Sequence, residues 1–264
     1  MIIILLPAFN EEKSLPQLLN KLEVTLVAIK EDYRIIVCND GSTDKTQEIL
    51  EKSSKTISLE IIKHRVNRGL GETIRDLFER AAAISSDNDI IIRFDCDDTH
   101  EPKYISSLID KIRSGYDVVT ASRFEKGGGQ YGVNYYRSFI SRCANLFMSI
   151  FFPIKGIKDY SCGYRGYNSK IIKKAISFYA NDFIQLKGLG FTCTLEKLVK
   201  LKIIGARFGE IPFELRYDQK VSDSKMVSSI TTLGYIVMTI LYHWPLGGWK
   251  YLYKKKIKNY KNNY

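Results

Sequence analysis

The chain has 264 residues, 45% of them hydrophobic and 26% charged, which suffices for one large domain or two small ones with a substantial buried core. This composition does not fit a disordered chain, a collagen-like repeat or a small disulfide scaffold. The 40 Lys and Arg against 29 Asp and Glu give a formal net charge of +11, which indicates a polyanionic partner: nucleic acid, an anionic membrane or a phosphorylated substrate.

In the N-terminal half, short β-branched runs alternate with longer amphipathic segments. The apolar runs predict buried strands at residues 2–6, 34–38, 59–62, 90–94 and 117–121. Helices are predicted between them, near residues 13–30, 43–54, 70–84 and 102–114. The first run has no basic stretch before it and soon meets a proline and two glutamates, so we expect a strand and not a signal peptide. This succession predicts an α/β fold with a mostly parallel, doubly wound, Rossmann-like sheet that binds ligands at the carboxyl ends of its strands.

Polar or glycine-containing loops follow all five predicted strands. They read PAFNEE, NDGSTD, NRGLG, DCDD and SR, beginning at residues 7, 39, 67, 95 and 122. Because the carboxyl ends of parallel strands meet at one edge of the sheet, these loops are expected to form one cleft with carboxylates, backbone amides and an arginine.

Asp95 and Asp97 stand two residues apart, directly after the fourth predicted strand. In an extended backbone their side chains point to one face, and two neighbouring carboxylates repel each other unless one is protonated or a cation lies between them. Mg²⁺ or Mn²⁺, held by one or two carboxylates together with phosphate oxygens of a substrate, satisfies this requirement. The pair therefore predicts a divalent cation and a diphosphate substrate, and the alternative is a solvated acidic loop.

Six segments, one of which contains this pair, strengthen the first interpretation. They read, in chain order, PAFNEE, NDGSTDKT, FDCDD, GYDVVTASR, DYSCGYR and EIPFELRY with a later SK. In this order and spacing the chain resembles the inverting glycosyltransferases of family 2, which have the GT-A fold, and among them the dolichol-phosphate mannose synthases and bacterial polyprenyl-phosphate sugar synthases. The resemblance runs from residue 2 to about residue 227. It implies transfer of a sugar from a GDP- or UDP-linked donor, with Mg²⁺ or Mn²⁺ as cofactor.

The resemblance also assigns roles to residues at matching positions. Around the nucleotide sugar it places Pro7, Phe9, Glu11, Cys38, Asp40, Asp95, Cys96, Asp97 and Arg123, of which Asp95 and Asp97 are the implied metal ligands. The implied catalytic residues are Asp97, Arg123, Arg216 and Lys225, the last two facing donor or acceptor phosphate. The stretch from Arg216 to Lys225 is longer than the family's RxxGxSK pattern and lacks its glycine.

The acceptor is inferred from the need for a base. A hydroxyl acceptor requires a general base, whereas a phosphate monoester is already ionised and requires none. Asp159 and Glu196 are the candidate bases, and neither has a distinctive sequence context. We therefore expect a polyprenyl phosphate acceptor, as the resemblance also implies, with a hydroxyl of a cell-surface polysaccharide or glycolipid as the alternative.

Two functions of other classes fit less well. A sugar-1-phosphate nucleotidyltransferase needs a glycine-rich, basic loop after the first strand, where this chain has an acidic one. A nucleic-acid binder would explain the charge of +11, but the chain has no recognisable reading module, so nucleic acid is not an expected partner. The sugar, the nucleotide base and the oligomeric state do not follow from the sequence.

Two segments indicate contact with a membrane. Residues 138–152 have the pattern of an amphipathic helix, and residues 226–249 contain no Asp, Glu, Lys or Arg. Serine and threonine dilute the second segment, and a proline and two glycines end it, which favours a helix in the membrane interface over one that spans the bilayer. The alternative for both helices is packing against the domain.

The basic charge is concentrated at the C-terminus. Six lysines and no acidic residue lie between residues 250 and 264, which leaves +5 for the rest of the chain. We expect a catalytic domain at residues 1–225, then an amphipathic helix and a Lys-rich tail at residues 226–264. A peripheral location on the cytoplasmic face of an anionic membrane is predicted, and five widely separated cysteines fit that reducing compartment.

Several other polar residues have open interpretations. Arg123 either approaches the diphosphate or pairs with an acid, and Arg165 either packs between sheet and helix or meets a phosphate. His64, His100 and His243 lack a pattern of partners for catalysis or metal binding, so structural roles are expected.

Overall fold

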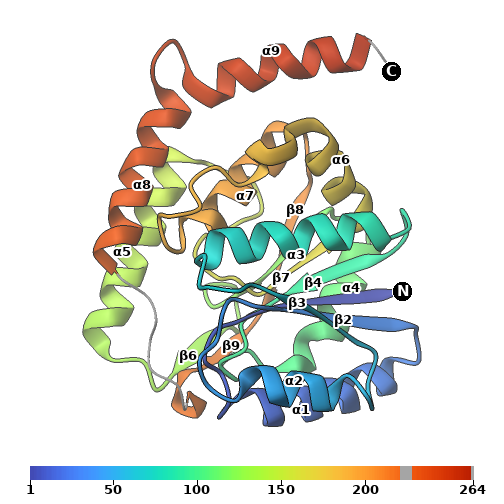
Figure 1. Ribbon diagram of the computed structural model, residues 1–264. Coiled ribbons are helices and arrows are strands. Elements are labelled where there is room, and N and C mark those ends of the chain that lie inside the picture. Colours follow the sequence, from blue (N-terminus) through green and yellow to red (C-terminus); the bar gives the residue numbers. More distant parts are fainter. Residues whose placement is uncertain (221–227, 263–264) are drawn as a thin grey trace.

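The computed structural model describes residues 1–220 and 228–262, and a seven-stranded sheet forms its centre (Figure 1). The strand order is β3-β2-β1-β4-β7-β5-β8. The strands are β1 (Ile2–Ala8), β2 (Tyr33–Asn39), β3 (Leu59–Lys63), β4 (Ile90–Arg93), β5 (Val118–Ser122), β7 (Arg165–Asn168) and β8 (Phe208–Pro212). All neighbours pair in parallel except β7, which runs antiparallel between β4 and β5. The predicted mostly parallel α/β sheet is confirmed.

Helices cover both faces of this sheet (Figure 1). They are α1 (Leu15–Ile29), α2 (Thr46–Ser53), α3 (Leu70–Ile84), α4 (Ile105–Arg113), α5 (Tyr135–Phe151), α6 (Ser169–Tyr179), α7 (Thr192–Ile203), α8 (Ser228–His243) and α9 (Gly248–Asn262), with short 3-10 helices η1 (Pro102–Tyr104), η2 (Ala180–Phe183) and η3 (Tyr217–Gln219). The four helices predicted in the N-terminal half correspond to α1, α2, α3, and η1 with α4. Helix α2 begins three residues later than predicted, because the side chains of Ser42 and Asp44 bind backbone amides of the loop after β1.

Two hydrophobic layers lie on the two faces of the sheet. Along β1, Ile3 and Leu5 belong to the layer beneath α3 and α7, whereas Ile2, Ile4 and Leu6 belong to the layer beneath α1 and α4. Because helices bury both faces, the strand is apolar at every one of these positions.

A small second sheet lies against the loop after β4. It consists of β6 (Gly129–Tyr131) and β9 (Glu214–Arg216), which pair in parallel. The backbone amide of Arg216 donates to the carbonyl of Thr99 at 3.1 Å. This contact holds β9 and the following η3 beside the Asp95–Asp97 motif.

The helices predicted at residues 138–152 and within residues 226–249 correspond to α5 and α8, and α9 follows them. The inner side of α8 and α9 is buried: Met238, Tyr242, Trp249 and Tyr253 belong to the same hydrophobic layer as α3 and α7. In the part of the chain that the structure describes, no helix is long and apolar enough to cross a membrane.

Candidate active site

The loops after β1 and β2 are joined by hydrogen bonds into one surface. The amide of Asn10 donates to Ser42 Oγ at 2.9 Å, and the amide of Thr43 donates to Asn10 Oδ1 at 2.8 Å. One residue further on, the amide of Glu11 donates to Thr46 Oγ1 at 2.8 Å. The prediction that these loops meet at one edge of the sheet is confirmed.

The residues predicted to surround the nucleotide line this edge. Pro7 belongs to the end of β1, Phe9 follows the strand, and both are partly buried. The carboxylate of Glu11 is buried and accepts a hydrogen bond from Ser14 Oγ at 2.6 Å. Glu11 thus stabilises the start of α1, and its contact with a nucleotide stays a prediction.

Asp40 fastens the loop after β3 to the end of β2. Its buried carboxylate accepts hydrogen bonds from the amides of Arg68 at 2.8 Å and Gly69 at 2.9 Å. His64 Nδ1 lies 2.6 Å from the same carboxylate, and His64 Nε2 lies 3.0 Å from Asp76. His64 therefore has the structural role expected of it, although its two partners were not predicted. Their positions after neighbouring strands are the signal that would have paired Asp40 with His64.

Cys38 and Cys96 are both buried beside this edge. The Sγ of Cys38 lies 3.5 Å from His64 Nε2. Burial raises the pKa of both thiols, so each remains protonated near neutral pH. Both side chains therefore pack in the interior. Cys96 also stands between the two motif aspartates in the sequence.

The two carboxylate oxygens of Asp97 have different partners, and one of them pairs with a cation. Its Oδ1 accepts hydrogen bonds from Thr99 Oγ1 at 2.7 Å and from the Thr99 amide at 3.3 Å. Its Oδ2 pairs with the ammonium of Lys220, the residue that follows η3. Burial opposes ionisation, but nearby positive charge, including the ammonium of Lys220, holds the pKa of Asp97 below its ordinary value. Asp97 is therefore a charged carboxylate at neutral pH.

Asp95 is held by two neighbours of its own. Its Oδ1 accepts a hydrogen bond from Arg93 Nη2 at 2.5 Å, and its amide donates to His100 Nδ1 at 3.1 Å. Burial lowers the pKa of His100, which keeps Nδ1 unprotonated and able to accept this bond. His100 thus has the structural role expected of it, although its partner was not predicted. Sequence reasoning missed Arg93, whose position two residues before Asp95 in an extended backbone is the signal that would have placed it beside the motif.

The third acidic residue of this loop faces elsewhere. Asp98 has a left-handed backbone, with φ of 58°, and both its oxygens accept hydrogen bonds from Lys21 Nζ at 3.0 Å. Lys21 also donates to Glu101 at 3.1 Å. Asp98 thus fixes the loop to α1 and does not join Asp95 and Asp97.

Arg123 follows β5 and is engaged by an acid. Its Nε and Nη2 each donate to Asp159 at 2.8 Å, and Nη2 also donates to Ser161 Oγ at 2.6 Å. The pairing alternative for Arg123 is therefore correct, with a fully buried partner instead of a surface acid. This pair does not test whether the guanidinium also approaches a diphosphate.

Neither candidate base is available to a substrate. Asp159 is fully buried, and besides Arg123 it accepts hydrogen bonds from Ser161 Oγ and the amide of Cys162. Glu196 is also fully buried and accepts hydrogen bonds from the amides of residues 185 and 186 and from Lys200 Nζ. The suggestion that either acts as a base is wrong, because all their oxygens are already engaged away from solvent.

The remaining predicted residues are placed as follows. Arg165 is a packing residue: it is buried and donates to Thr120 Oγ1 and to the carbonyls of residues 160 and 194. The side chain of Arg216 binds Asp218 at 2.7 Å on the surface, so only its backbone meets the motif loop. Lys225 lies outside the described residues.

The motif carboxylates fit a divalent cation that is shared with a substrate. Within the described residues, no group of three His, Cys, Asp or Glu side chains forms a complete metal site. Mg²⁺ and Mn²⁺ sites, however, commonly use one or two carboxylates and complete their coordination with substrate phosphates. The ammonium of Lys220 on Asp97 shows that this oxygen accommodates a cation.

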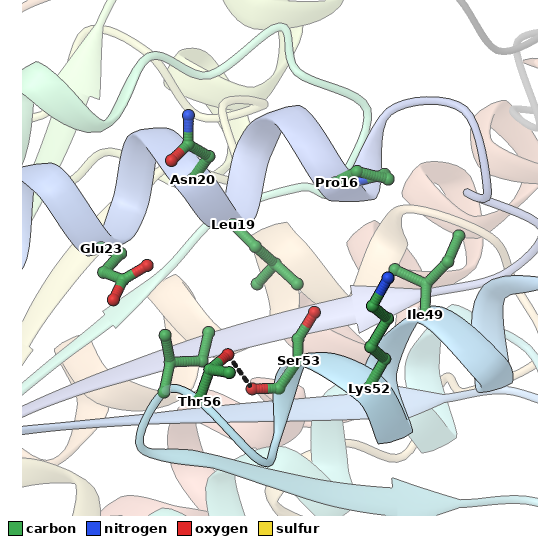
Figure 2. A pocket seen from close by; sticks show the side chains of 9 residues that line it. Pro16, Leu19, Asn20, Glu23, Ile49, Lys52, Ser53 and Thr56 are labelled. Carbon is green, nitrogen blue, oxygen red and sulfur yellow. Dashed lines mark hydrogen bonds between the residues drawn. The ribbon is translucent and has the colours of Figure 1, made fainter.

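A separate surface hollow of about 360 Å³ lies between α1 and α2 (Figure 2). Its walls include Leu19 of α1 and Ile49 of α2, with Lys52 and Glu23 at its rim. No residue predicted for the site lines it.

A comparison with known proteins finds a family that matches this chain. Residues 3–176 match the family described as Glycosyl transferase family 2. A dolichol-phosphate mannosyltransferase of Pyrococcus furiosus is 28% identical over 211 residues, which are 80% of this chain and 55% of that protein. An undecaprenyl-phosphate 4-deoxy-4-formamido-L-arabinose transferase of Pseudomonas aeruginosa is 27% identical over 74% of this chain and 56% of its own length. This chain thus spans just over half the length of these relatives.

A solved structure with a similar fold is glucosyl-3-phosphoglycerate synthase of Mycobacterium tuberculosis, in complex with Mn²⁺, UDP and phosphoglyceric acid. The TM-score is 0.60 at 17% sequence identity, and the match covers 91% of this chain and 77% of that one. At this identity the likeness establishes the fold alone.

Proposed function

Because the chain belongs to glycosyltransferase family 2, we propose that it transfers a sugar from a nucleoside diphosphate sugar to a polyprenyl phosphate, with Mg²⁺ or Mn²⁺ as cofactor. Its relatives from Pyrococcus and Pseudomonas carry names that specify dolichol phosphate and undecaprenyl phosphate. The solved neighbour with Mn²⁺ and UDP supports the choice of cofactor and of donor class.

The observation that carries the choice of acceptor is the engagement of both candidate bases. Asp159 and Glu196 are fully buried, and hydrogen bonds occupy their carboxylates. A hydroxyl acceptor would need one of them, or another group, to remove its proton. A phosphate monoester brings an ionised oxygen and needs no base, so it is the acceptor that suits this site.

The reaction follows from these assignments. A phosphate oxygen of the acceptor forms a bond to the anomeric carbon while the bond from that carbon to the donor diphosphate breaks, and the configuration inverts. The nucleoside diphosphate leaves with the electron pair. When bound to Asp95 and Asp97, the divalent cation would neutralise charge on this leaving group. Arg123, held in place by Asp159 and Ser161, would add a fixed positive charge at the same edge of the sheet.

An exposed apolar surface supports a peripheral membrane location. On α5 Ile150 is 64% exposed, and on α8 Leu233 and Ile240 are 53% and 54% exposed. The two helices contact each other at their ends, where His243 Nε2 lies 2.9 Å from the carbonyl of Phe151. We propose that this surface, named here the α5–α8 face, lies in the cytoplasmic interface of the membrane, where a lipid acceptor and a cytosolic donor meet.

A transfer assay tests the proposed activity. Radiolabelled UDP- and GDP-sugars are incubated with the protein, Mn²⁺ and polyprenyl phosphate, and the label is extracted into organic solvent. We expect a lipid-linked monosaccharide from one donor, and Asp97→Ala should abolish it. Asp87→Asn is the matched control, because this exposed acid pairs with Lys173 on the surface and its replacement should leave transfer intact. Label that enters only a polysaccharide or glycolipid hydroxyl would refute the phosphate acceptor.

A further inference from the structure

The two motif carboxylates are compensated by cations of different kinds. Asp95 binds Arg93, the last residue of β4, whose side chain is 1% exposed and whose strand lies between β1 and β7. Asp97 binds Lys220, whose side chain is 11% exposed and whose backbone belongs to no helix or strand. The first cation is therefore fixed within the sheet, whereas the second is held by irregular backbone and is partly accessible to solvent.

Burying the charged side chain of Arg93 in the interior costs stability. Its Nε and Nη1 are buried without a hydrogen-bond partner among the described residues, so the Asp95 contact is its one polar compensation there. Leaving buried donors of a charged group unpaired costs stability. Arg165, directly opposite on β7, is equally buried but makes three hydrogen bonds to protein groups. The hydrogen bonds within the domain thus explain why an arginine is buried at position 165. They do not explain why one is buried at position 93.

The surroundings of Arg93 supply no second acid among the described residues. The neighbouring basic residue is Lys197, whose pKa is held well below its usual range by burial and, after it, by the charge of Arg93. Lys197 Nζ lies 4.7 Å from the ring centroid of Phe78. The guanidinium therefore has one acidic partner within reach, and this partner is the motif residue Asp95.

Gly163 holds the guanidinium against Asp95. A Cβ atom at position 163 would lie 1.8 Å from Arg93 Nη1 and 3.6 Å from Asp95 Oδ2. Any larger residue would displace the guanidinium from its place beside the carboxylate. Backbone of the loop before β7 and the Asp95 side chain thus enclose Arg93 from two sides.

We propose that Arg93 is a positioning residue that permanently compensates and orients Asp95, so that a divalent cation has to displace only Lys220 from Asp97. This inference rests on the proposed metal-dependent function. Arginine remains protonated at all relevant pH values, so Asp95 keeps its counter-charge in every state of the site. The arrangement lowers affinity for the free cation and leaves Asp95 aligned before the donor arrives.

Binding of Mn²⁺ alone tests the proposal without reference to turnover. Free Mn²⁺ is measured by electron paramagnetic resonance during titration of the full chain. Arg93→Met removes a positive charge close to the site, so it should tighten Mn²⁺ binding by about tenfold or more. The same variant should transfer sugar at least about tenfold more slowly, because Asp95 is no longer oriented. Arg93→Lys, which keeps the charge, should restore weak Mn²⁺ binding.

Three further variants complete the test. Lys220→Met should also tighten Mn²⁺ binding, because it removes the exchangeable cation. Lys197→Met changes a buried lysine of the same cluster that does not contact the motif, and it should leave Mn²⁺ binding within about twofold of the original protein. Arg93→Gln, a polar substitution, should reproduce Arg93→Met and replaces it if the methionine variant does not fold.

The outcomes separate this proposal from the function on which it rests. Failure of the unaltered protein to bind Mn²⁺, with or without UDP, would overturn metal dependence and the role of Arg93 together. Binding by the unaltered protein, with no tighter binding in Arg93→Met or Arg93→Gln, would overturn the role of Arg93 alone. Unchanged transfer rates in both variants would do the same.

Discussion

The carboxylate of Asp40 holds together the edge of the sheet at which the nucleotide is predicted to bind. It joins the end of β2 to the loop after β3 through two backbone amides and His64. The residue was predicted to lie beside the nucleotide base. Its hydrogen bonds explain why an acid is needed there even before a ligand binds, since in the described part of the chain these two amides donate to Asp40 alone.

Asp40→Asn should therefore destabilise the fold. The amide side chain offers one acceptor oxygen instead of two and carries no charge, so at least one buried donor loses its partner. We expect a loss of about 1–3 kcal/mol in the free energy of unfolding, measured by urea denaturation. Asp87→Asn is the control, because Asp87 pairs with Lys173 on the surface and its replacement should leave the denaturation midpoint unchanged. Equal midpoints for the two variants would contradict the role of Asp40.

The pair of Arg123 and Asp159 predicts a pH dependence of stability. Burial opposes ionisation of Asp159, but Arg123 and its hydrogen bonds hold the pKa of the carboxyl below the ordinary Asp value. A folded-state pKa below the unfolded one means that the contribution to stability is complete above the unfolded pKa of about 4 and is lost as pH falls through the folded value.

Asp159→Asn should thus cost about 3–5 kcal/mol at pH 7, because it leaves a buried guanidinium uncompensated. The difference from the original protein should shrink as the pH is lowered below about 4. Urea denaturation of both proteins at several pH values measures it. A difference that stays constant down to pH 3 would show that ionisation of Asp159 does not stabilise the fold.

The sequence was sufficient to place Asp95 and Asp97 but not their partners. The two aspartates were found because a fixed spacing after a buried strand carries their chemistry. Arg93 stands two residues before Asp95, so the two-residue period of a strand places both on one face, but the burial that pairs them follows from the fold. His100 and Lys220 meet the motif only through the path of the loop after β4 and the approach of η3 to it, which no periodicity in the chain encodes.

At the level of elements, the continuous apolar runs identified the five strands within two residues at each end. This success has a simple cause, since helices bury both faces of most of these strands and their polar residues stand mainly near the strand ends. β7 escaped prediction because Arg165–Asn168 is short and contains a buried arginine that satisfies its donors across β5 and α7. Its antiparallel direction follows from tertiary pairing with β4 and β5, which local pattern does not determine.

Helices α5 and α8 were expected from the helical period of their apolar residues. The structure adds which of these residues face the domain and which face solvent. Met148 and Met238 point inward, while Ile150, Leu233 and Ile240 stay exposed. Packing against the domain was the alternative interpretation. This packing accounts for the apolar residues on the inner side of each helix. The exposed apolar residues on the outer side are the ones that we propose to contact a membrane.

Substitution on the α5–α8 face should weaken membrane binding. The double change Leu233→Asp and Ile240→Asp removes two exposed apolar side chains and adds negative charge, so the fraction of protein that floats with anionic liposomes should fall at least about fivefold, since the lost burial alone exceeds 1 kcal/mol. Val24→Asp and Val27→Asp on α1 is the matched control, because these valines are 65% and 61% exposed on the opposite side of the sheet (Figure 1). Equal loss in both variants would refute a specific face.

For the whole molecule, the net charge of +11 divides between the domain and the C-terminal segment. Within the domain, the basic residues near the motif are paired with acids: Arg93 with Asp95, Lys220 with Asp97, and Arg123 with Asp159. The cleft before metal binding is therefore close to electrically balanced. Six of the eleven excess charges lie between residues 250 and 264, beyond the helix that carries the exposed apolar residues.

The lysines of α9 predict salt-sensitive binding to anionic membranes. The side chains of Lys250, Lys254, Lys255 and Lys256 are exposed, while Trp249 and Tyr253 anchor the helix in the hydrophobic layer of the domain. Because that anchor fixes α9, its lysines form a charged surface that can approach lipid headgroups together with the α5–α8 face. Each lysine near an anionic surface contributes about 1 kcal/mol.

Replacing these four lysines with glutamine should lower partitioning into liposomes with anionic lipid by at least about tenfold at low salt. Partitioning into purely zwitterionic liposomes should change little, because the α5–α8 face remains intact. Raising the salt concentration should weaken binding of the original protein more than that of the variant, since screening acts on the charges that the variant lacks. Partitioning of the variant that equals the original on anionic liposomes at low salt would mean that α9 faces away from the bilayer, and membrane contact would then depend on the α5–α8 face alone.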